Sequence, residues 1–334
     1  VLLVVALLAL TLESPSWERW LSVVFVMAMQ ALSGVAKDLT KMSSKSAVKT
    51  VAGDGSLFRL VAILTGSKNA LKGVGFFVGA ALLAGVGYDG ALYVMSGALA
   101  LTIVGLVVLL DEDIGRSKKK PPLRSVLSKS SAINRLSAAR FFLFGSRDIW
   151  FVVALPVFLS ERLAWGDRGV GAFLALWVIG YGVVQSAAPL LLTRGGRDVD
   201  EVRATRQWAL VLAGVSAVLA LLVELDVAVT ASVVVGLIVF GVVFAMNSSL
   251  HSYLVLAYAD DDEVALDVGF YYSANAAGRL VGTLLSGVLY LWGGLPAALW
   301  GSTAFVVLTW LGAARLPAVP ENVTVSLAGV EGGD

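Results

Sequence analysis

The 334-residue sequence contains no cysteine and a single histidine, His251. The lack of cysteine excludes disulfides, thiolate metal sites and cysteine nucleophiles, and one histidine cannot supply a multi-histidine metal cluster. Charged residues are also scarce, at 15% of the chain against about a quarter in soluble globular proteins, whereas hydrophobic residues reach 58%. This composition predicts an integral membrane protein in a lipid bilayer, with no metal, no cofactor and no enzyme activity.

Ten apolar stretches follow one another along the chain. The first, Val1–Leu12, would rise only ~18 Å as a helix against the ~30 Å apolar core of a bilayer. We interpret it as a truncated span rather than a signal peptide, because it lacks a basic flank and a small-residue cleavage pattern. The other expected spans lie near Trp20–Ala36, Leu60–Val86, Ala91–Leu110, Leu136–Leu159, Val170–Leu192, Trp208–Leu225, Val227–Ala257, Val268–Trp292 and Leu295–Leu316.

The longest polar loop, residues 111–135, separates four of these stretches from six and contains the basic run Ser117–Pro122. Two six-helix halves joined by a basic central loop are the plan of the major facilitator superfamily. The sequence therefore predicts an all-α transmembrane fold of this kind, with about the first two helices absent. The expected parts are a partial N-terminal half over 1–110, a linker over 111–135, a C-terminal six-helix half over 136–316 and a tail over 317–334.

Positive and negative charges nearly balance, with 25 Lys and Arg against 24 Asp and Glu. No net basic field exists to hold a phosphate backbone, so nucleic acid is not an expected partner. The basic residues nevertheless gather in alternate loops, and loops rich in Lys and Arg stay cytoplasmic. Fifteen of them, including Lys118–Lys120, lie on one side against three on the other. The linker and the C-terminal tail are thus expected in the cytoplasm.

Several charges fall inside expected spans, where each costs roughly 2.5–3.5 kcal/mol. Thr65, Lys68, Asn69 and Lys72 recur at helical spacing, which gives one helix a polar, cationic face. Counted from Leu60 at the cytoplasmic surface, Lys68 and Lys72 lie roughly 12 and 18 Å deep. Lys72 is therefore expected near the middle of the membrane.

The C-terminal half carries a second set of polar groups inside its spans. Arg140 and Arg147 are two helical turns apart, and Asp148 is expected to pair poorly with its neighbour Arg147 because it lies about 100° away around the helix. Two further groups share helix faces: Asn247 with His251, and Asp267, Tyr271, Asn275 and Arg279. Cations outnumber acids, which favours an anionic substrate at the midplane. Snorkelling or pairing with other groups is the alternative for any single residue.

Five polar blocks carry a resemblance to a known family. The chain resembles the organoarsenical efflux permeases of bacterial arsenic-resistance operons, the ArsJ group of the major facilitator superfamily. The resemblance rests on Ala31–Ser43, Ile63–Gly73, Phe142–Pro156, Asn247–Tyr253 and Asp267–Arg279. It implies a bacterial inner-membrane antiporter that exports 1-arseno-3-phosphoglycerate, the product formed when glyceraldehyde-3-phosphate dehydrogenase uses arsenate in place of phosphate.

The expected substrate-binding residues are those polar groups of the two halves: Lys68, Asn69, Lys72, Arg140, Arg147, Asn247, His251, Tyr271, Asn275 and Arg279. The candidates for proton coupling are Asp148, His251 and Asp267, although His251 could equally hydrogen-bond between helices. Other readings stay open. One is a carrier for a different phosphorylated metabolite, another is a membrane hydrolase built on Ser248, Ser249 and His251, and the third is a nontransporting receptor.

Overall fold

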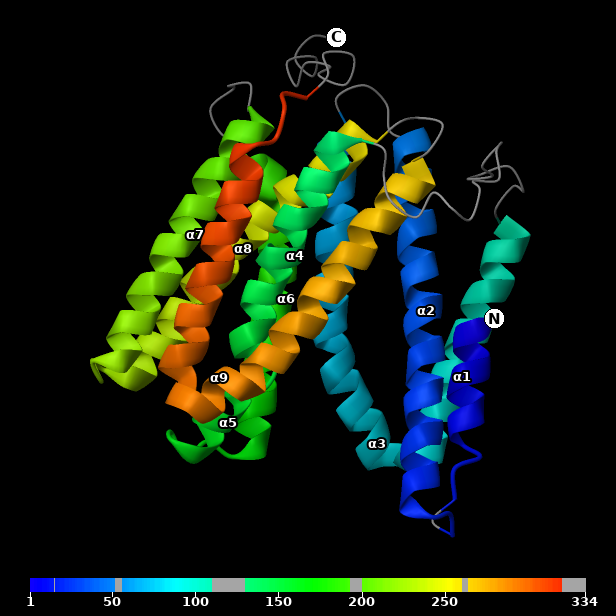
Figure 1. Ribbon diagram of the computed structural model, residues 1–334. Helices are drawn as coiled ribbons and strands as arrows, with labels where there is room; N and C mark the ends of the chain where they lie inside the picture. Colours follow the sequence, from blue (N-terminus) through cyan, green and yellow to red (C-terminus); the bar gives the residue numbers. More distant parts are fainter. Residues whose placement is uncertain (15, 52–55, 110–129, 193–199, 260–263, 320–334) are drawn as a thin grey trace, which may run out of the picture. The chain divides into compact units, whose positions relative to one another are not determined.

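The computed structural model describes residues 1–14, 16–51, 56–109, 130–192, 200–259 and 264–319, and the regular elements in these ranges are all α-helices (Figure 1). Seven segments are long and apolar enough to cross a membrane. The helices are α1 (Leu2–Leu10), α2 (Arg19–Val51), α3 (Leu57–Leu109), α4 (Ser131–Phe151), α5 (Ala154–Glu161), α6 (Asp167–Leu192), α7 (Glu201–Glu224), α8 (Val229–Tyr258) and α9 (Val264–Ala314). The expected all-α transmembrane fold is confirmed.

Two of the helices each contain two of the expected spans. Helix α3 has 53 residues and α9 has 51, far more than the roughly 20 that one crossing requires. Each is interrupted at glycine: α3 at Gly87, with φ of 73°, and α9 at Gly293 and Gly294, the latter with φ of 64°. Glycine adopts these positive φ values without a Cβ clash, so the chain can turn back there.

One expected span is divided by a proline. Helices α4 and α5 meet at Val152 and Val153, just before Pro156, whose ring clashes with the carbonyl four residues earlier. The backbone N–H groups of Val153 and Ala154 donate instead to Ser286 Oγ of α9, at 3.2 and 3.0 Å. A side chain from a neighbouring helix thus satisfies the backbone groups that the break exposes, as an apolar environment requires.

Helices α2 and α7 extend furthest beyond the apolar stretches that predicted them. Helix α2 was expected to end near Ala36 but continues to Val51, because the polar stretch that follows contains neither glycine nor proline. Helix α7 begins at Glu201, seven residues before the expected start at Trp208. Its first turn is capped by Asp200, whose Oδ1 accepts from the Arg203 N–H at 2.8 Å.

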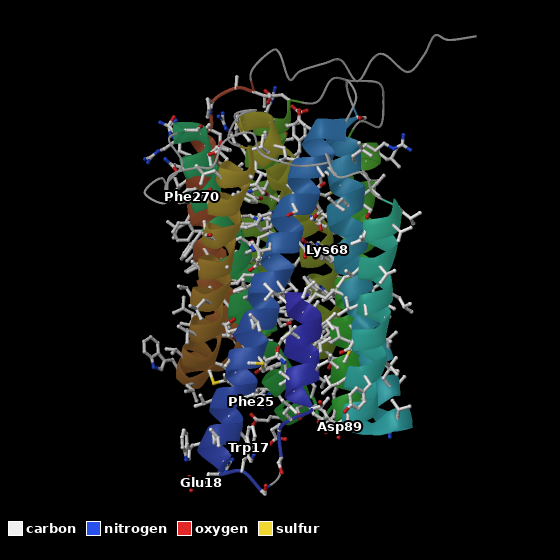
Figure 2. The ribbon with its side chains drawn as sticks, turned by 90° about the vertical axis from the view of Figure 1, so that its right-hand side faces the viewer. Trp17, Glu18, Phe25, Lys68, Asp89 and Phe270 are labelled. Atoms are coloured by element: carbon white, nitrogen blue, oxygen red, sulfur yellow. The ribbon has the colours of Figure 1, made fainter. Side chains whose placement is uncertain are left out.

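The chain forms two compact units, and residues from before the linker contribute to both. The first unit comprises residues 1–50 and 75–118, and the second comprises residues 51–74 and 119–334. In the first unit, Trp17 packs edge-to-face against Phe25 at the beginning of α2, with ring centroids 5.2 Å apart (Figure 2). The basic run of the expected linker lies outside the described residues.

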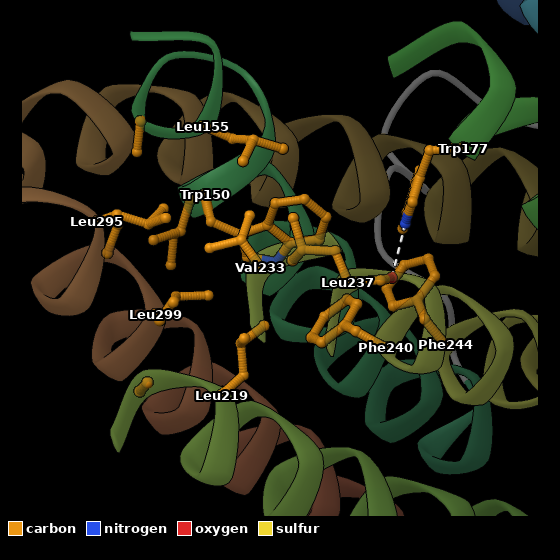
Figure 3. Packing of buried hydrophobic residues seen from close by; sticks show 14 of the residues in the cluster. Trp150, Leu155, Trp177, Leu219, Val233, Leu237, Phe240, Phe244, Leu295 and Leu299 are labelled. Atoms are coloured by element: carbon orange, nitrogen blue, oxygen red, sulfur yellow. Dashed lines mark hydrogen bonds between the residues drawn. The ribbon is translucent and has the colours of Figure 1, made fainter. Parts of the chain in front are cut away.

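The core of the second unit is a cluster of aromatic and aliphatic side chains from α4 to α9. Trp150 packs edge-to-face against Trp177 and Phe240, and the Trp177 Nε1–H donates to the Leu237 carbonyl at 2.7 Å (Figure 3). Leu295 and Leu299 extend the cluster to the last segment of α9. This apolar core surrounds the polar groups that could form a site.

Helices α4 and α9 pack through glycine. A Cβ at Gly278 would lie 2.1 Å from the Phe141 carbonyl oxygen, and one at Gly282 would lie 2.5 Å from the Gly145 oxygen. Such backbone contact is possible only without a side chain, as at other small-residue seams in membranes. Gly75 and Gly79 have the same four-residue spacing, but an added Cβ at either has no atom of the described residues within 4 Å.

Candidate functional site

Arg140 lies in the interior of the second unit and is only 2% exposed. Its Nε donates to Asn275 Oδ1 at 3.2 Å, and its Nη1 donates to the carbonyl and the hydroxyl of Ser248 at 3.3 and 3.1 Å. The guanidinium carbon also lies 3.8 Å from the ring centroid of Phe144 and 5.1 Å from that of Tyr271. Neutral acceptors and aromatic faces therefore stabilise this buried cation.

A chain of hydrogen bonds continues from Arg140 across three more helices. Ser248 Oγ also accepts from Tyr181 Oη and from Gln185 Nε2, both at 3.1 Å. Gln185 Oε1 in turn accepts from Asn69 Nδ2 at 2.6 Å. Asn69 of α3 is thereby linked through α6 and α8 to Arg140 of α4. We call Arg140, Asn275, Ser248, Tyr181, Gln185 and Asn69 the neutral network.

A second cluster, two turns further along α4, contains a carboxylate. Asp148 Oδ1 accepts from the Arg147 Nε at 2.7 Å and also from its Nη2, while Asp148 Oδ2 accepts from the Arg279 Nε at 2.8 Å. The expectation that Arg147 and Asp148 pair poorly is wrong. The long arginine side chain reaches its neighbour's carboxylate, which is 1% exposed and needs donors in place of water. We call Arg147, Asp148 and Arg279 the ionic cluster.

The two arginines of the ionic cluster differ in their surroundings. The side chain of Arg147 is 12% exposed and lies near the rings of Phe144, Phe151 and Phe244, with centroid distances of 5.2 to 5.8 Å. The side chain of Arg279 is 41% exposed. The ionic cluster has two arginines for one carboxylate, and Arg140 has only neutral hydrogen-bond partners, so these groups together carry a surplus of positive charge.

Other expected site residues lie on the surface or at a helix end. Lys68 and Lys72 are exposed and share the first segment of α3 with Asn69, where Figure 2 labels Lys68. Asp267 is 4% exposed and belongs to the first turn of α9. The structure therefore joins Asn69, Arg140 and Asn275 in one network and Arg147 and Arg279 in another.

Three expected binding residues are completely buried. Asn247 donates through Nδ2 to the Thr205 carbonyl at 3.4 Å, and its Oδ1 has no partner among the described residues. The same is true of both ring nitrogens of His251 and of the Tyr271 hydroxyl. These side chains lie in the packed interior, where unpartnered polar atoms are uncommon.

The residues of the alternative hydrolase site are not arranged for nucleophilic catalysis. Ser248 Oγ accepts hydrogen bonds from Arg140, Tyr181 and Gln185. Ser249 Oγ donates to the Gln185 carbonyl at 3.4 Å. His251 has no hydrogen bond to either serine, although a nucleophile needs a base within reach. In the described ranges, no group of three or more His, Asp or Glu residues could hold a metal ion.

Tyr181 and Gln185 are parts of the network that the sequence did not single out. Gln185 is fully buried, and it is an isolated amide within the apolar stretch Val170–Leu192. The sequence could have identified Gln185, because a single amide within an apolar span needs hydrogen-bond partners on other helices.

No protein-family model and no curated protein matches the sequence. Several solved structures of transporters match the fold. A bacterial homologue of the iron transporter ferroportin, in an outward-facing state, has a TM-score of 0.72 and 17% identity, over 94% of this chain and 80% of that one. The human organic anion transporter MFSD10 has a TM-score of 0.69 and 17% identity, over 93% and 76%.

The fucose:proton symporter FucP of E. coli has a TM-score of 0.65 and 11% identity, over 94% of this chain and 83% of its own. Similarity at this level of identity shows a shared fold. The chain thus has the fold of the major facilitator transporters, in agreement with the expected fold class.

Proposed function

We propose that the chain is a secondary active transporter that exports an organoarsenical, 1-arseno-3-phosphoglycerate, from the cytoplasm of a bacterium and so confers resistance to arsenate. The observation that carries the proposal is that the neutral network and the ionic cluster together contain three arginines but one carboxylate, Asp148. A protein that keeps buried cations at this cost gains most if an anion binds to them. The transporter fold and the resemblance of five polar blocks to the arsenical permeases support the same function.

The chemistry of the cargo fits the two kinds of cation. The cargo has a phosphate at one end and an arsenate at the other, and each is a tetrahedral oxyanion. The guanidinium fork of Arg279 can bind such a group through two parallel hydrogen bonds, whereas Lys68 and Lys72 act as point charges. Arg147 adds to the positive field. In this proposal the arginines bind one end of the cargo and the lysines the other.

The remaining proposed binding residues surround Arg140. Asn69 and Asn275 are members of its network, and Asn247, His251 and Tyr271 are buried in the same unit. We propose that these five residues hold the arginine side chains in position and adjust the electrostatic potential around them. Contact with the cargo would require a conformation in which their packing opens.

Export against a gradient requires coupling, and we propose proton antiport through Asp148, His251 or Asp267. Asp148 is the strongest candidate, because it contacts two of the proposed cargo-binding arginines. Single variants Asp148→Asn, His251→Gln and Asp267→Asn separate the three. The coupling residue is the one whose loss abolishes accumulation driven by a pH gradient while cargo exchange continues. Undiminished uphill export by all three variants would contradict proton coupling through these groups.

Everted membrane vesicles containing the full-length protein test the cargo. Supplied with arsenate, glyceraldehyde 3-phosphate, NAD and glyceraldehyde-3-phosphate dehydrogenase, they should accumulate arsenic, and omission of the dehydrogenase should abolish the uptake. Uptake that is independent of the dehydrogenase would point to arsenate itself, and no uptake at all would contradict the proposed cargo.

A second candidate function is transport of another phosphorylated or anionic metabolite. One structural neighbour is described as an organic anion transporter, and the arginine surplus would suit many such anions. Vesicles that take up a phosphorylated metabolite in the absence of arsenate would favour this alternative. Uptake of any of these anions would disfavour a nontransporting receptor.

A further inference from the structure

Asp148 holds two arginines through two different oxygen atoms. Oδ1 is bound by Arg147, through both Nε and Nη2, whereas Oδ2 is bound by the Arg279 Nε. Arg147 is the sequence neighbour of Asp148, is nearly buried, and lies among three aromatic rings. Arg279 comes from another helix and is the more exposed of the two. The Arg279 contact is therefore the one that an incoming anion can replace.

The backbones on either side of the ionic cluster cannot readily move apart or together. Helices α4 and α9 touch through Gly145, Gly278 and Gly282, where an added Cβ would lie within 3.0 Å of the facing backbone. Packing at this density has few intermediate positions. When an anion replaces Asp148 at Arg279, only side chains therefore need to move. Asp148 stays close to Arg279 and competes with the anion for it.

We propose that Asp148 is an internal competitor anion that sets the charge a cargo must carry, so that the site accepts dianionic oxyanions and rejects monoanions of the same shape. The inference rests on the proposed function and concerns the same site. A free monoanion that displaces Asp148 from Arg279 gains about the same Coulomb attraction as it removes, and it loses translational freedom that the tethered carboxylate has already lost. A dianion gains about twice that attraction.

Two probes that differ in charge and share a tetrahedral head group isolate this effect. Phenylphosphonate is mainly dianionic at pH 8, and benzenesulfonate is monoanionic. Equilibrium dialysis with the full-length protein in detergent should show phenylphosphonate binding at least about tenfold more tightly than benzenesulfonate. In Asp148→Asn, both probes should bind about tenfold more tightly than to the wild type, because the same competitor is removed for both, and benzenesulfonate should then bind about as tightly as phenylphosphonate binds to the wild type.

Three further variants make the test robust. Arg147→Gln combined with Asp148→Asn keeps the net charge of the ionic cluster, which protects folding, and should also bind benzenesulfonate more tightly than the wild type does. Arg279→Gln should lose binding of both probes. Asp226→Asn is the matched control, because Asp226 forms an exposed pair with Arg162 at 3.6 Å, and it should behave as the wild type.

The outcomes separate this inference from the proposed function. If removal of the carboxylate leaves the affinity for benzenesulfonate unchanged, the competitor role is overturned while an anion carrier stands. If wild-type protein binds neither probe, the competitor role and the anion site fall together. A gain in benzenesulfonate affinity in both variants lacking the carboxylate supports the competitor role.

Discussion

The two arginine sites of the second unit, Arg140 and Arg279, stabilise their positive charge in different ways. Arg140 is surrounded by neutral acceptors and aromatic rings, and its hydrogen bonds lead across α4, α6, α8, α9 and α3. Arg279 is paired with a carboxylate and is much more exposed. The first arrangement fixes several helices around one cation, and the second leaves a cation that a ligand can reach.

This difference indicates that Arg140 is structural and that Arg279 can bind a cargo. Removal of Arg140 would leave Asn275 Oδ1 without its Arg140 donor inside the bundle, and an unmade buried hydrogen bond costs more than a made one contributes. Removal of Arg279 would leave Asp148 with Arg147 still bound. We expect variants at the neutral network to lose stability and variants at Arg279 to lose transport.

The largest effect is expected at the seam that supports both sites. Gly278→Ala should lower the free energy of unfolding by about 3 kcal/mol, because its Cβ would meet the Phe141 carbonyl and one of the two helices would have to shift. Thermal unfolding in detergent measures the change. Gly287→Ala is the control on the same helix, since an added Cβ there meets nothing within 4 Å. Equal stability of the two variants would contradict the seam.

Arg140→Ala should cost about 2 kcal/mol of stability, because it removes three hydrogen bonds and two aromatic contacts from a buried position. Membrane abundance and thermal unfolding should fall together, and export per folded molecule should change less than abundance. A variant with normal stability and no export would move Arg140 from the structural to the cargo-binding role.

Arg279→Ala and Lys72→Ala should retain membrane abundance but lower export at least about tenfold, or ~1.4 kcal/mol, because each deletes an anion contact. Lys72→Arg should restore only part of the activity, since a planar fork replaces a compact ammonium. Initial rates in vesicles at matched expression measure the effect. Normal export by both alanine variants would show that neither Arg279 nor Lys72 is needed to bind the cargo. The proposed difference in role from Arg140 would then be wrong.

The smallest effect is expected at the edge of the neutral network. Gln185→Ala should cost about 1 kcal/mol, because it removes bonds to Ser248 and Asn69 while the bonds from Arg140 remain. The matched control is Gln207→Ala, at an exposed glutamine of α7. If the two variants unfold at the same temperature, the network contributes nothing at Gln185.

Much of the fold could be predicted from hydropathy, and the errors have local causes. The long apolar stretches predicted spans that correspond to helices or helix segments, and Gly87, Gly293 and Gly294 mark the turns within α3 and α9. The end of α2 and the start of α7 were misplaced, because helices extend beyond the apolar stretch when polar residues continue or cap them.

The sequence by itself determined that this protein crosses a membrane and that its apolar stretches contain more cations than carboxylates, because a charge within an apolar stretch is visible in the order of residues. The tertiary structure decided which of these charges meet. Asp148 contacts residue 279, and Gln185 joins residues 69 and 248. These residues are far apart in the sequence, and no helical spacing predicts their contact. The tertiary structure also decided that His251 and Tyr271 are enclosed, because burial depends on what the neighbouring helices place against each face.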